Sequence, residues 1–218
     1  MIEAIVFDLD GTLLYTLEDI RTVVNKVLNV NGMPDKTIDE IKNAVGRGVE
    51  ELARKVIPSN SLTDETLNSV SDQIRATYLE HDFRKTKPYP GIKELLNMLQ
   101  AKNMPMAVLT NKPQKSAEKA IQEYFGEFSF VSVQGVRKGY DTKPSKEAVV
   151  PVLRKLGSIP GNTLMIGDSD IDMDTARNAG MISVGVTWGF RDVSLLLDHG
   201  AHYTVDNPGE IMGIPGIK

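Results

Sequence analysis

The stretch IEAIVFDLDGT, residues 2–12, decides how this chain is interpreted. An apolar, strand-forming run over residues 2–7 stops abruptly at Asp8, and Asp10 and Gly11 follow. A short apolar run bounded by turn residues is typical of a buried strand. Side chains two positions apart on a strand point the same way, so the two carboxylates are expected to crowd together. Such crowding requires a cation or a shared proton, which makes this strand end a candidate reaction site.

Further apolar runs of the same kind lie downstream, and helical patterns separate them. The runs cover residues 104–109, 128–133, 163–166, 182–186 and 202–205. Apolar side chains recur on one helical face over residues 92–99, 116–125 and 145–156. Strands that alternate with helices predict an α/β fold, with a Rossmann-like parallel sheet covered by helices on both faces.

The segment from residue 16 to residue 84 breaks this alternation because it contains no convincing strand. Its apolar positions recur at helical spacing, and Thr37 to Glu40 has the form of a capping box, which starts a helix. We therefore expect an all-helical cap domain at 16–84, inserted in a core made of residues 1–15 and 85–218. Hinges are expected near residues 14–17 and 85–89.

Polar side chains directly follow three of the predicted strands, as the pairs Asp8/Asp10, Thr110/Asn111 and Asp168/Asp172. Each pair alone is as consistent with an ordinary turn as with a site. Ligands of an open parallel sheet bind beyond the carboxyl ends of its strands, so the three pairs together predict one site. The histidines lie outside every motif, and carboxylates without a nearby histidine favour a hard ion such as Mg²⁺.

Lys143 precedes Pro144 and a predicted helix, at a position where a lysine normally points into solvent. Together with the acidic clusters, we favour a different interpretation, in which Lys143 reaches an anion held near Asp8. Thr110 and Asn111 would offer a hydroxyl and an amide to the same anion, together with N–H groups at a helix start.

The composition limits the chemistry further. The 218 residues include no cysteine, which excludes a disulfide framework, a thiolate zinc site and a cysteine nucleophile. A net charge of −4 removes the electrostatic argument for nucleic-acid binding but leaves an anionic small molecule as a partner. No apolar run approaches the about 18 residues that span a bilayer, and no secretory leader is recognised. We expect a cytoplasmic protein, a monomer or homodimer, that does not bind a membrane.

Four motifs, in this order, carry a resemblance to a known family. They are Asp8-Leu9-Asp10-Gly11-Thr12-Leu13, Thr110-Asn111-Lys112, Lys143-Pro144 and Gly167-Asp168-Ser169-Asp170-Ile171-Asp172. Over nearly its whole length the chain resembles the haloacid dehalogenase-like hydrolase superfamily, and the helical insert resembles the cap of that superfamily. Residues 45–48 and 185–191 add a likeness to its phosphoglycolate phosphatase group.

The resemblance implies a Mg²⁺-dependent phosphatase that acts on a small phosphorylated metabolite, with 2-phosphoglycolate as the first choice. It assigns Asp8 as the nucleophile, which forms an aspartyl-phosphate. Asp10 would be the general acid for the leaving group and then the base for water. Mg²⁺ would be held by the Asp8 carboxylate, the Asp10 carbonyl and Asp168.

The same resemblance assigns the phosphoryl-binding side chains. They would be Thr110, Asn111 and Lys143. Asp172 would be an outer metal ligand or would orient Lys143. Asp170, in the same acidic motif, is expected to be a first-turn acid that the helix dipole favours.

Two positions leave the substrate open. Relatives often carry Asp-Ser after the first motif, whereas this chain has Tyr15-Thr16, and Tyr15 would either pack at the hinge or contact substrate. Arg47, between Gly46 and Gly48, would either bind a substrate carboxylate or be an exposed turn residue.

Other activities share the four motifs. A pyrophosphatase or a β-phosphoglucomutase-like phosphotransferase would use the same residues, and the mutase would release no net phosphate. A receiver-like phosphoacceptor, which is not an enzyme, also has strand-end acids, Mg²⁺ and a lysine, but it stops after one phosphate per chain. The position of Asp10 and the helical insert argue against that last class.

Overall fold

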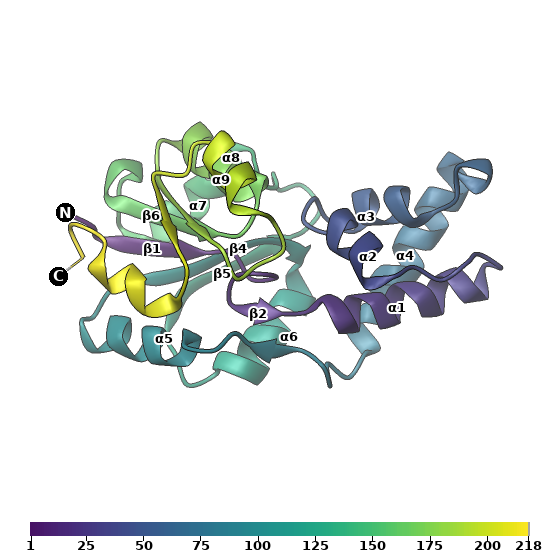
Figure 1. Ribbon diagram of the computed structural model, residues 1–218, viewed down its shortest axis with the longest axis horizontal. Helices are drawn as coiled ribbons and strands as arrows, with labels where there is room; N and C mark the ends of the chain where they lie inside the picture. Colours follow the sequence, from purple (N-terminus) through teal and green to yellow (C-terminus); the bar gives the residue numbers. More distant parts are fainter. Residues whose placement is uncertain (218) are drawn as a thin grey trace. The chain divides into compact units, whose positions relative to one another are not determined.

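The computed structural model describes residues 1–217, which fold into two compact units (Figure 1). One unit combines residues 1–15 with the chain from Pro88 onward. The other unit comprises Thr16–Lys87. Among the described residues, no helix combines the length and the apolar character that crossing a lipid bilayer requires.

The first unit is built on a six-stranded parallel sheet in the order β5-β4-β1-β6-β7-β8. Its strands are β1 (Ala4–Phe7), β4 (Met106–Pro113), β5 (Phe130–Val136), β6 (Thr163–Gly167), β7 (Ile182–Val186) and β8 (Tyr203–Val205). The short strands β2 (Leu14–Tyr15) and β3 (Lys87–Pro88) form a separate two-stranded sheet. The predicted α/β class with a parallel sheet is therefore confirmed.

Helices cover both faces of the large sheet. The side chains of β1 alternate between the two faces, and those on each face are apolar and pack against the helices there. Ile5 and Phe7 belong to one buried core, and Ala4 and Val6 belong to the other. The first core includes α5 (Ile92–Ala101) and α6 (Gln114–Phe125), and the second includes α7 (Lys146–Leu156) and α8 (Asp170–Ala179). Figure 1 shows the two pairs of helices on opposite sides of the strands. The shorter helices are α9 (Val193–Asp198), η2 (Pro160–Asn162) and η3 (Pro208–Gly213).

The strand order creates a switch point beside β1. Within the sheet, β4 and β5 lie on one side of β1, and the later strands β6, β7 and β8 lie on the other side of β1. At a switch point, the loops that follow two neighbouring strands run in opposite directions. Open parallel sheets bind their ligands in the crevice between these loops. The loops after β1 and β6 begin at Asp8 and Asp168.

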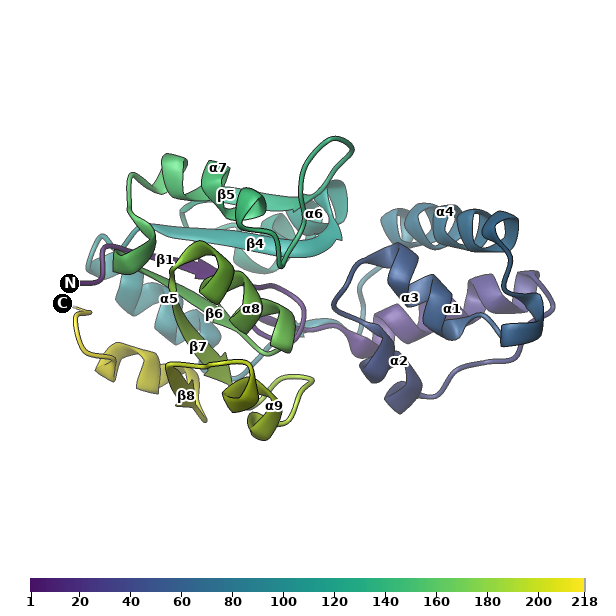
Figure 2. The same cartoon turned by 90° about the horizontal axis from the view of Figure 1, so that it is seen from above.

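The second unit is built from helices (Figure 2). They are α1 (Leu17–Val30), α2 (Ile38–Ala44), α3 (Val49–Val56), the short η1 (Ser59–Ser61) and α4 (Asp64–Glu80). The predicted capping box starts α2: the Glu40 N–H donates to Thr37 Oγ1, and the Thr37 N–H donates to the Glu40 carboxylate at 2.8 Å. Two main-chain N–H groups at the start of α2 therefore donate hydrogen bonds to local side chains.

A buried carboxylate ties the two ends of this helical unit together. Asp19, in the first turn of α1, is 2% exposed. It accepts hydrogen bonds from the N–H groups of Lys85 and Thr86 at 3.1 and 2.6 Å and from the Thr86 hydroxyl at 2.7 Å. Its other oxygen lies 2.8 Å from Nε2 of His81. Burial alone would raise the pKa of Asp19, but the hydrogen bonds from His81 and Thr86 outweigh it and hold the pKa below its usual value.

Replacing Asp19 with asparagine is expected to lower the free energy of unfolding by about 2 kcal/mol near neutral pH, because buried N–H donors lose a charged acceptor. The pKa of Asp19 is lower in the folded than in the unfolded chain. Its contribution is therefore present above about pH 4 and is lost as the pH falls through the folded-state pKa. Urea unfolding of wild type and Asp19→Asn at several pH values should give curves that converge in acid.

The exposed residue Asp35 offers the control. Asp35→Asn should change the free energy of unfolding by less than about 0.5 kcal/mol. An equal loss in the two variants, or a loss for Asp19→Asn that does not depend on pH, would contradict this account.

Candidate active site

Three buried carboxylates meet beyond the ends of the neighbouring strands β1 and β6. Asp8 directly follows β1, Asp168 directly follows β6, and Asp172 lies in the first turn of α8. One carboxylate oxygen from each lies within 4.8 Å of the others. The three acids could therefore hold a metal ion, and the predicted metal contacts of Asp8 and Asp168 stay predictions.

Lys143 supplies the positive charge inside this acidic cluster. Its Nζ lies 2.7 Å from Oδ1 of Asp8 and 2.6 Å from Oδ1 of Asp172. The Lys143 side chain is only 3% exposed, so both ion pairs lie away from water. Lys143 thus points into the site and not into solvent, and Asp172 contacts it directly.

Side-chain amides and hydroxyls fix the position of this ion-pair network. Both polar groups of the Asn111 side chain bind the Lys143 main chain, with Nδ2 donating to its carbonyl and Oδ1 accepting from its N–H, each at 3.0 Å. Oδ2 of Asp172 accepts from the N–H of Ser169 at 3.1 Å and from its hydroxyl at 2.6 Å. Asn111 therefore positions Lys143, and its contact with a phosphoryl group stays a prediction.

The Asp168 carboxylate is held by two loops. Oδ1 accepts from the Thr12 hydroxyl at 3.2 Å, and Oδ2 accepts from the N–H of Phe190 at 2.7 Å. Gly11 has a φ of +96°, and a Cβ atom there would overlap this carboxylate. A Cβ atom on Gly189 would also overlap Asp168, so both loops require glycine to approach so closely.

Burial of so much negative charge around one lysine perturbs the pKa values of the cluster. Burial raises the pKa of Asp8 to about 7, with the Asp172 carboxylate acting in the same direction and Lys143 opposing it. Burial, Asp172 and Asp8 raise the pKa of Asp168 well above its usual value. Burial alone would lower the pKa of Lys143, but Asp172 and Asp8 outweigh it and raise the pKa. A bound cation would favour the ionised forms of Asp8 and Asp168.

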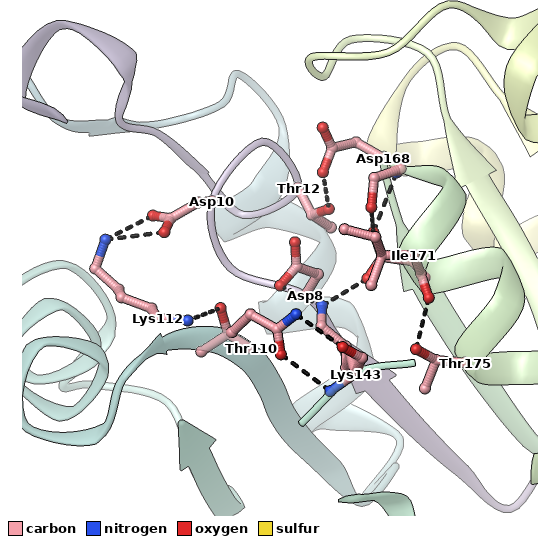
Figure 3. A network of polar contacts seen from close by, with 12 residues as sticks. Asp8, Asp10, Thr12, Thr110, Lys112, Lys143, Asp168, Ile171 and Thr175 are labelled. Atoms are coloured by element: carbon pink, nitrogen blue, oxygen red, sulfur yellow. Dashed lines mark hydrogen bonds and ion pairs between the residues drawn. The ribbon is translucent and has the colours of Figure 1, made fainter. Parts of the chain in front are cut away.

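The Asp10 carboxylate does not join this cluster. Figure 3 shows Asp10 turned toward Lys112, whose Nζ lies 2.8 and 2.9 Å from the two Asp10 oxygens. Lys112 comes from β4, as does Thr110, and both side chains are buried. The N–H of Lys112 donates to the Thr110 hydroxyl at 3.3 Å. A metal contact of Asp10 through its main-chain carbonyl, as the resemblance implies, stays a prediction.

The two candidate specificity residues lie in different units. Tyr15 packs edge-on against Tyr89, with ring centroids 6.1 Å apart. Arg47 is exposed in the turn between α2 and α3 of the helical unit, where Gly46 and Gly48 both have positive φ. Their contacts with a substrate stay predictions.

The histidines are engaged outside the acidic cluster. His81 contacts Asp19, His199 contacts Asp174 at 3.0 Å, and His202 contacts Ser183 at 2.7 Å. This arrangement agrees with their position outside the motifs.

Sequence reasoning missed two contacts that support the site. The ion pair between Lys112 and Asp10 joins positions 102 residues apart, and Phe190 holds Asp168 with a main-chain N–H that any residue type could supply. One indication for Lys112 was available, because it lies two positions after Thr110 at a strand end and therefore faces the same side.

Comparisons with known proteins agree with this geometry. The family model described as haloacid dehalogenase-like hydrolase matches residues 5–186. A phosphoglycolate phosphatase of Aquifex aeolicus is 30% identical over 210 residues, which cover 95% of this chain and 94% of the relative. A phosphoglycolate phosphatase of Chromobacterium violaceum is 30% identical, with 96% and 95% of the two chains covered.

Solved structures of similar proteins share the whole fold. The crystal structure of a candidate phosphoglycolate phosphatase from Lactobacillus delbrueckii subsp. bulgaricus is 31% identical and superposes with a TM-score of 0.89, covering 98% of both chains. With this likeness and a family match across most of its length, the chain belongs to the haloacid dehalogenase-like hydrolase family, as its four motifs predict.

Proposed function

We propose that this hydrolase is a Mg²⁺-dependent phosphatase that cleaves a small organic phosphomonoester, 2-phosphoglycolate first among them. The observation that carries the proposal is the buried contact of Lys143 with both Asp8 and Asp172, beside Asp168. Such a site offers a carboxylate nucleophile, a cation for phosphoryl oxygens and acids for a metal. The named relatives in Aquifex aeolicus and Chromobacterium violaceum support the choice of substrate.

The donor set fits Mg²⁺. Asp8 and Asp168 offer hard carboxylate oxygens, and the Asp10 carbonyl would add a third protein ligand, with Asp172 behind them. Burial, together with the neighbouring carboxylates, raises the pKa values of Asp8 and Asp168, and a divalent cation would favour their ionised forms. When bound, Mg²⁺ would shield the phosphate from the anionic nucleophile and offset charge in the transition state.

The first chemical step transfers the phosphoryl group to Asp8. An Asp8 carboxylate oxygen attacks phosphorus, the ester P–O bond breaks, and the electron pair leaves with the alkoxide oxygen. Asp10 gives its carboxyl proton to that oxygen and becomes a carboxylate. Thr110, Asn111 and Lys143 are proposed to bind the phosphoryl oxygens, and the Lys143 ammonium favours the ionised form of Asp8 that attacks.

The second step hydrolyses the aspartyl-phosphate. A water oxygen attacks phosphorus while the Asp10 carboxylate takes a water proton, and the bond between phosphorus and Asp8 breaks. Inorganic phosphate is released, and Asp8 is regenerated as a carboxylate. Asp10 ends the cycle protonated, which is the form that the next leaving group requires.

The helical unit is proposed to act as the cap that the resemblance implies. Arg47, in the helical unit, and Tyr15, in the first unit, are the candidate contributors to substrate choice. Arg47 could pair with a carboxylate through two parallel hydrogen bonds.

Phosphate release from a panel of substrates tests the proposed activity. With Mg²⁺ present, kcat/KM should be higher for 2-phosphoglycolate than for pyrophosphate and glucose 1-phosphate. A preference for pyrophosphate, or isomerised sugar phosphate without free phosphate, would assign the site to another activity. Uptake of one phosphate per chain without turnover would make the protein a phosphoacceptor.

Asp8→Asn should lower kcat by at least about a thousandfold, because the variant has no carboxylate nucleophile. Its circular dichroism spectrum should match that of the wild type, since asparagine keeps the shape of the side chain and the fold. The matched control is Asp170→Asn in the acidic run of α8, which should keep most of the activity. Residual activity of Asp8→Asn above about a thousandth of wild type would exclude Asp8 as the nucleophile.

Chelation of Mg²⁺ should stop phosphate release, and added Mg²⁺ should restore it. Binding should also stabilise the fold, by about 2.7 kcal/mol at a Mg²⁺ concentration about 100 times Kd. A thermal shift with and without Mg²⁺ measures this without substrate. The shift should be clearly smaller in Asp168→Asn than in wild type, and equal shifts would remove Asp168 from the metal site.

A further inference from the structure

Trp188 joins two loops that lie on either side of the end of β6. Its indole Nε1–H donates to the main-chain carbonyl of Thr12 at 3.0 Å. Thr12 lies in the loop after β1, and Trp188 lies in the loop between β7 and α9. In the sheet, β6 lies between β1 and β7, and Asp168 directly follows β6. The hydrogen bond of Trp188 therefore bridges the strand end that carries Asp168.

Each of these two loops holds one oxygen of the Asp168 carboxylate. The Thr12 hydroxyl donates to Oδ1 at 3.2 Å, as Figure 3 shows, and the N–H of Phe190 donates to Oδ2 at 2.7 Å. Thr12 and Asp168 are both buried. Because one loop binds each oxygen, the direction in which the carboxylate points depends on how the two loops lie relative to each other.

The main chains of the two loops are in close contact. A Cβ atom on Gly189 would overlap both Asp168 and the carbonyl oxygen of Gly11. Residues 187–192 are all described, and they belong to neither a helix nor a strand. No regular ladder of hydrogen bonds therefore sets the distance of this segment from the loop after β1, and Trp188 supplies a side-chain bond that does.

We propose that Trp188 is a positioning residue of the metal site, whose indole N–H sets the orientation of Asp168 and thereby the affinity for Mg²⁺. Trp188 acts through Thr12 and Phe190 and does not touch the metal itself. This inference rests on the proposed function, in which Asp168 is a metal ligand. Groups that orient metal ligands typically contribute about 10- to 100-fold to metal affinity.

Isothermal titration calorimetry with Mg²⁺ alone tests the inference without substrate. Trp188→Phe keeps an aromatic ring in the core but has no N–H to donate. Its Kd for Mg²⁺ should be about tenfold higher than that of the wild type, or more. Asp168→Asn, which removes the proposed ligand itself, should weaken binding further.

Phe130→Leu is the matched control. Phe130 and Trp188 are both partly buried and pack against the same core. Phe130 begins β5 and pairs with Met106, the first residue of β4, so it lies at the amino end of the sheet, away from the site. Phe130→Leu should lower the free energy of unfolding and leave the Kd for Mg²⁺ unchanged. A Trp188 with a purely structural role would give the same result as Phe130.

A double-mutant cycle tests whether Trp188 acts through the loop after β1. Thr12→Val removes the hydroxyl that binds Asp168 and keeps the shape of the side chain. Trp188→Phe should raise the Kd less in the Thr12→Val background than in the wild type, because one of the two contacts with Asp168 is already lost. Effects that simply multiply would show that the two residues are independent and would contradict this account.

The fluorescence of Trp188 gives a second measurement, because the chain has one tryptophan. Indole emission depends on the hydrogen bond and the charges around the ring. Adding Mg²⁺ to the wild type should change the emission with the Kd found by calorimetry, and the change should be absent in Asp168→Asn. Emission that does not respond while calorimetry detects binding would contradict a link between Trp188 and the metal site.

The outcomes distinguish this inference from the proposed function. If the wild type binds no Mg²⁺ in either measurement, the proposed metal site is wrong, and the role of Trp188 is overturned with it. If Asp168→Asn weakens Mg²⁺ binding and Trp188→Phe keeps the Kd of the wild type, the metal site stands and the role of Trp188 is overturned.

Discussion

The burial of three carboxylates around one lysine is the constraint on which the rest of the site depends. Lys143 contacts Asp8 and Asp172 and so offsets part of the negative charge that gathers where these two acids meet Asp168. Further hydrogen bonds hold these groups in place: Asn111 binds the Lys143 main chain, and the Ser169 hydroxyl donates to Asp172. Burial raises the pKa values of Asp8 and Asp168, the neighbouring carboxylates add to the rise, and a bound cation would favour the ionised forms of both acids.

The sheet supplies the rigidity that this charge cluster needs. β1 is buried between β4 and β6, and Ile5 and Phe7 pack in a core on one face while Ala4 and Val6 pack on the other. Packing on four sides fixes the end of β1, where Asp8 begins the loop. Burial there, together with the neighbouring carboxylates, raises the pKa values of Asp8 and Asp168.

The sequence was informative where chemistry follows secondary structure. Asp8, Asp168 and Lys143 were predicted because they directly follow strands or precede a helix, and a parallel sheet brings such positions to one edge. The partners of Asp10 and Asp19 could not be predicted in this way. Lys112 pairs with a residue 102 positions away, and Thr86 pairs with one 67 positions away, and both choices depend on side-chain rotamers and loop paths. Asn111 shows the same limit, because its position was predicted but its partner was not.

The contact between Asp19 and Thr86 also affects how the chain reaches its fold. It closes a loop of 67 residues inside the helical unit. Once this unit has formed, the two ends of the segment between β1 and α5 are held close together. The segment then costs the assembly of the sheet little more chain entropy than a short loop would. The entropy lost in bringing β1 next to β4 then depends on a few linking residues and not on the whole insert. The helical unit is thus a folded connection, whose size can change in evolution with little effect on how the sheet assembles.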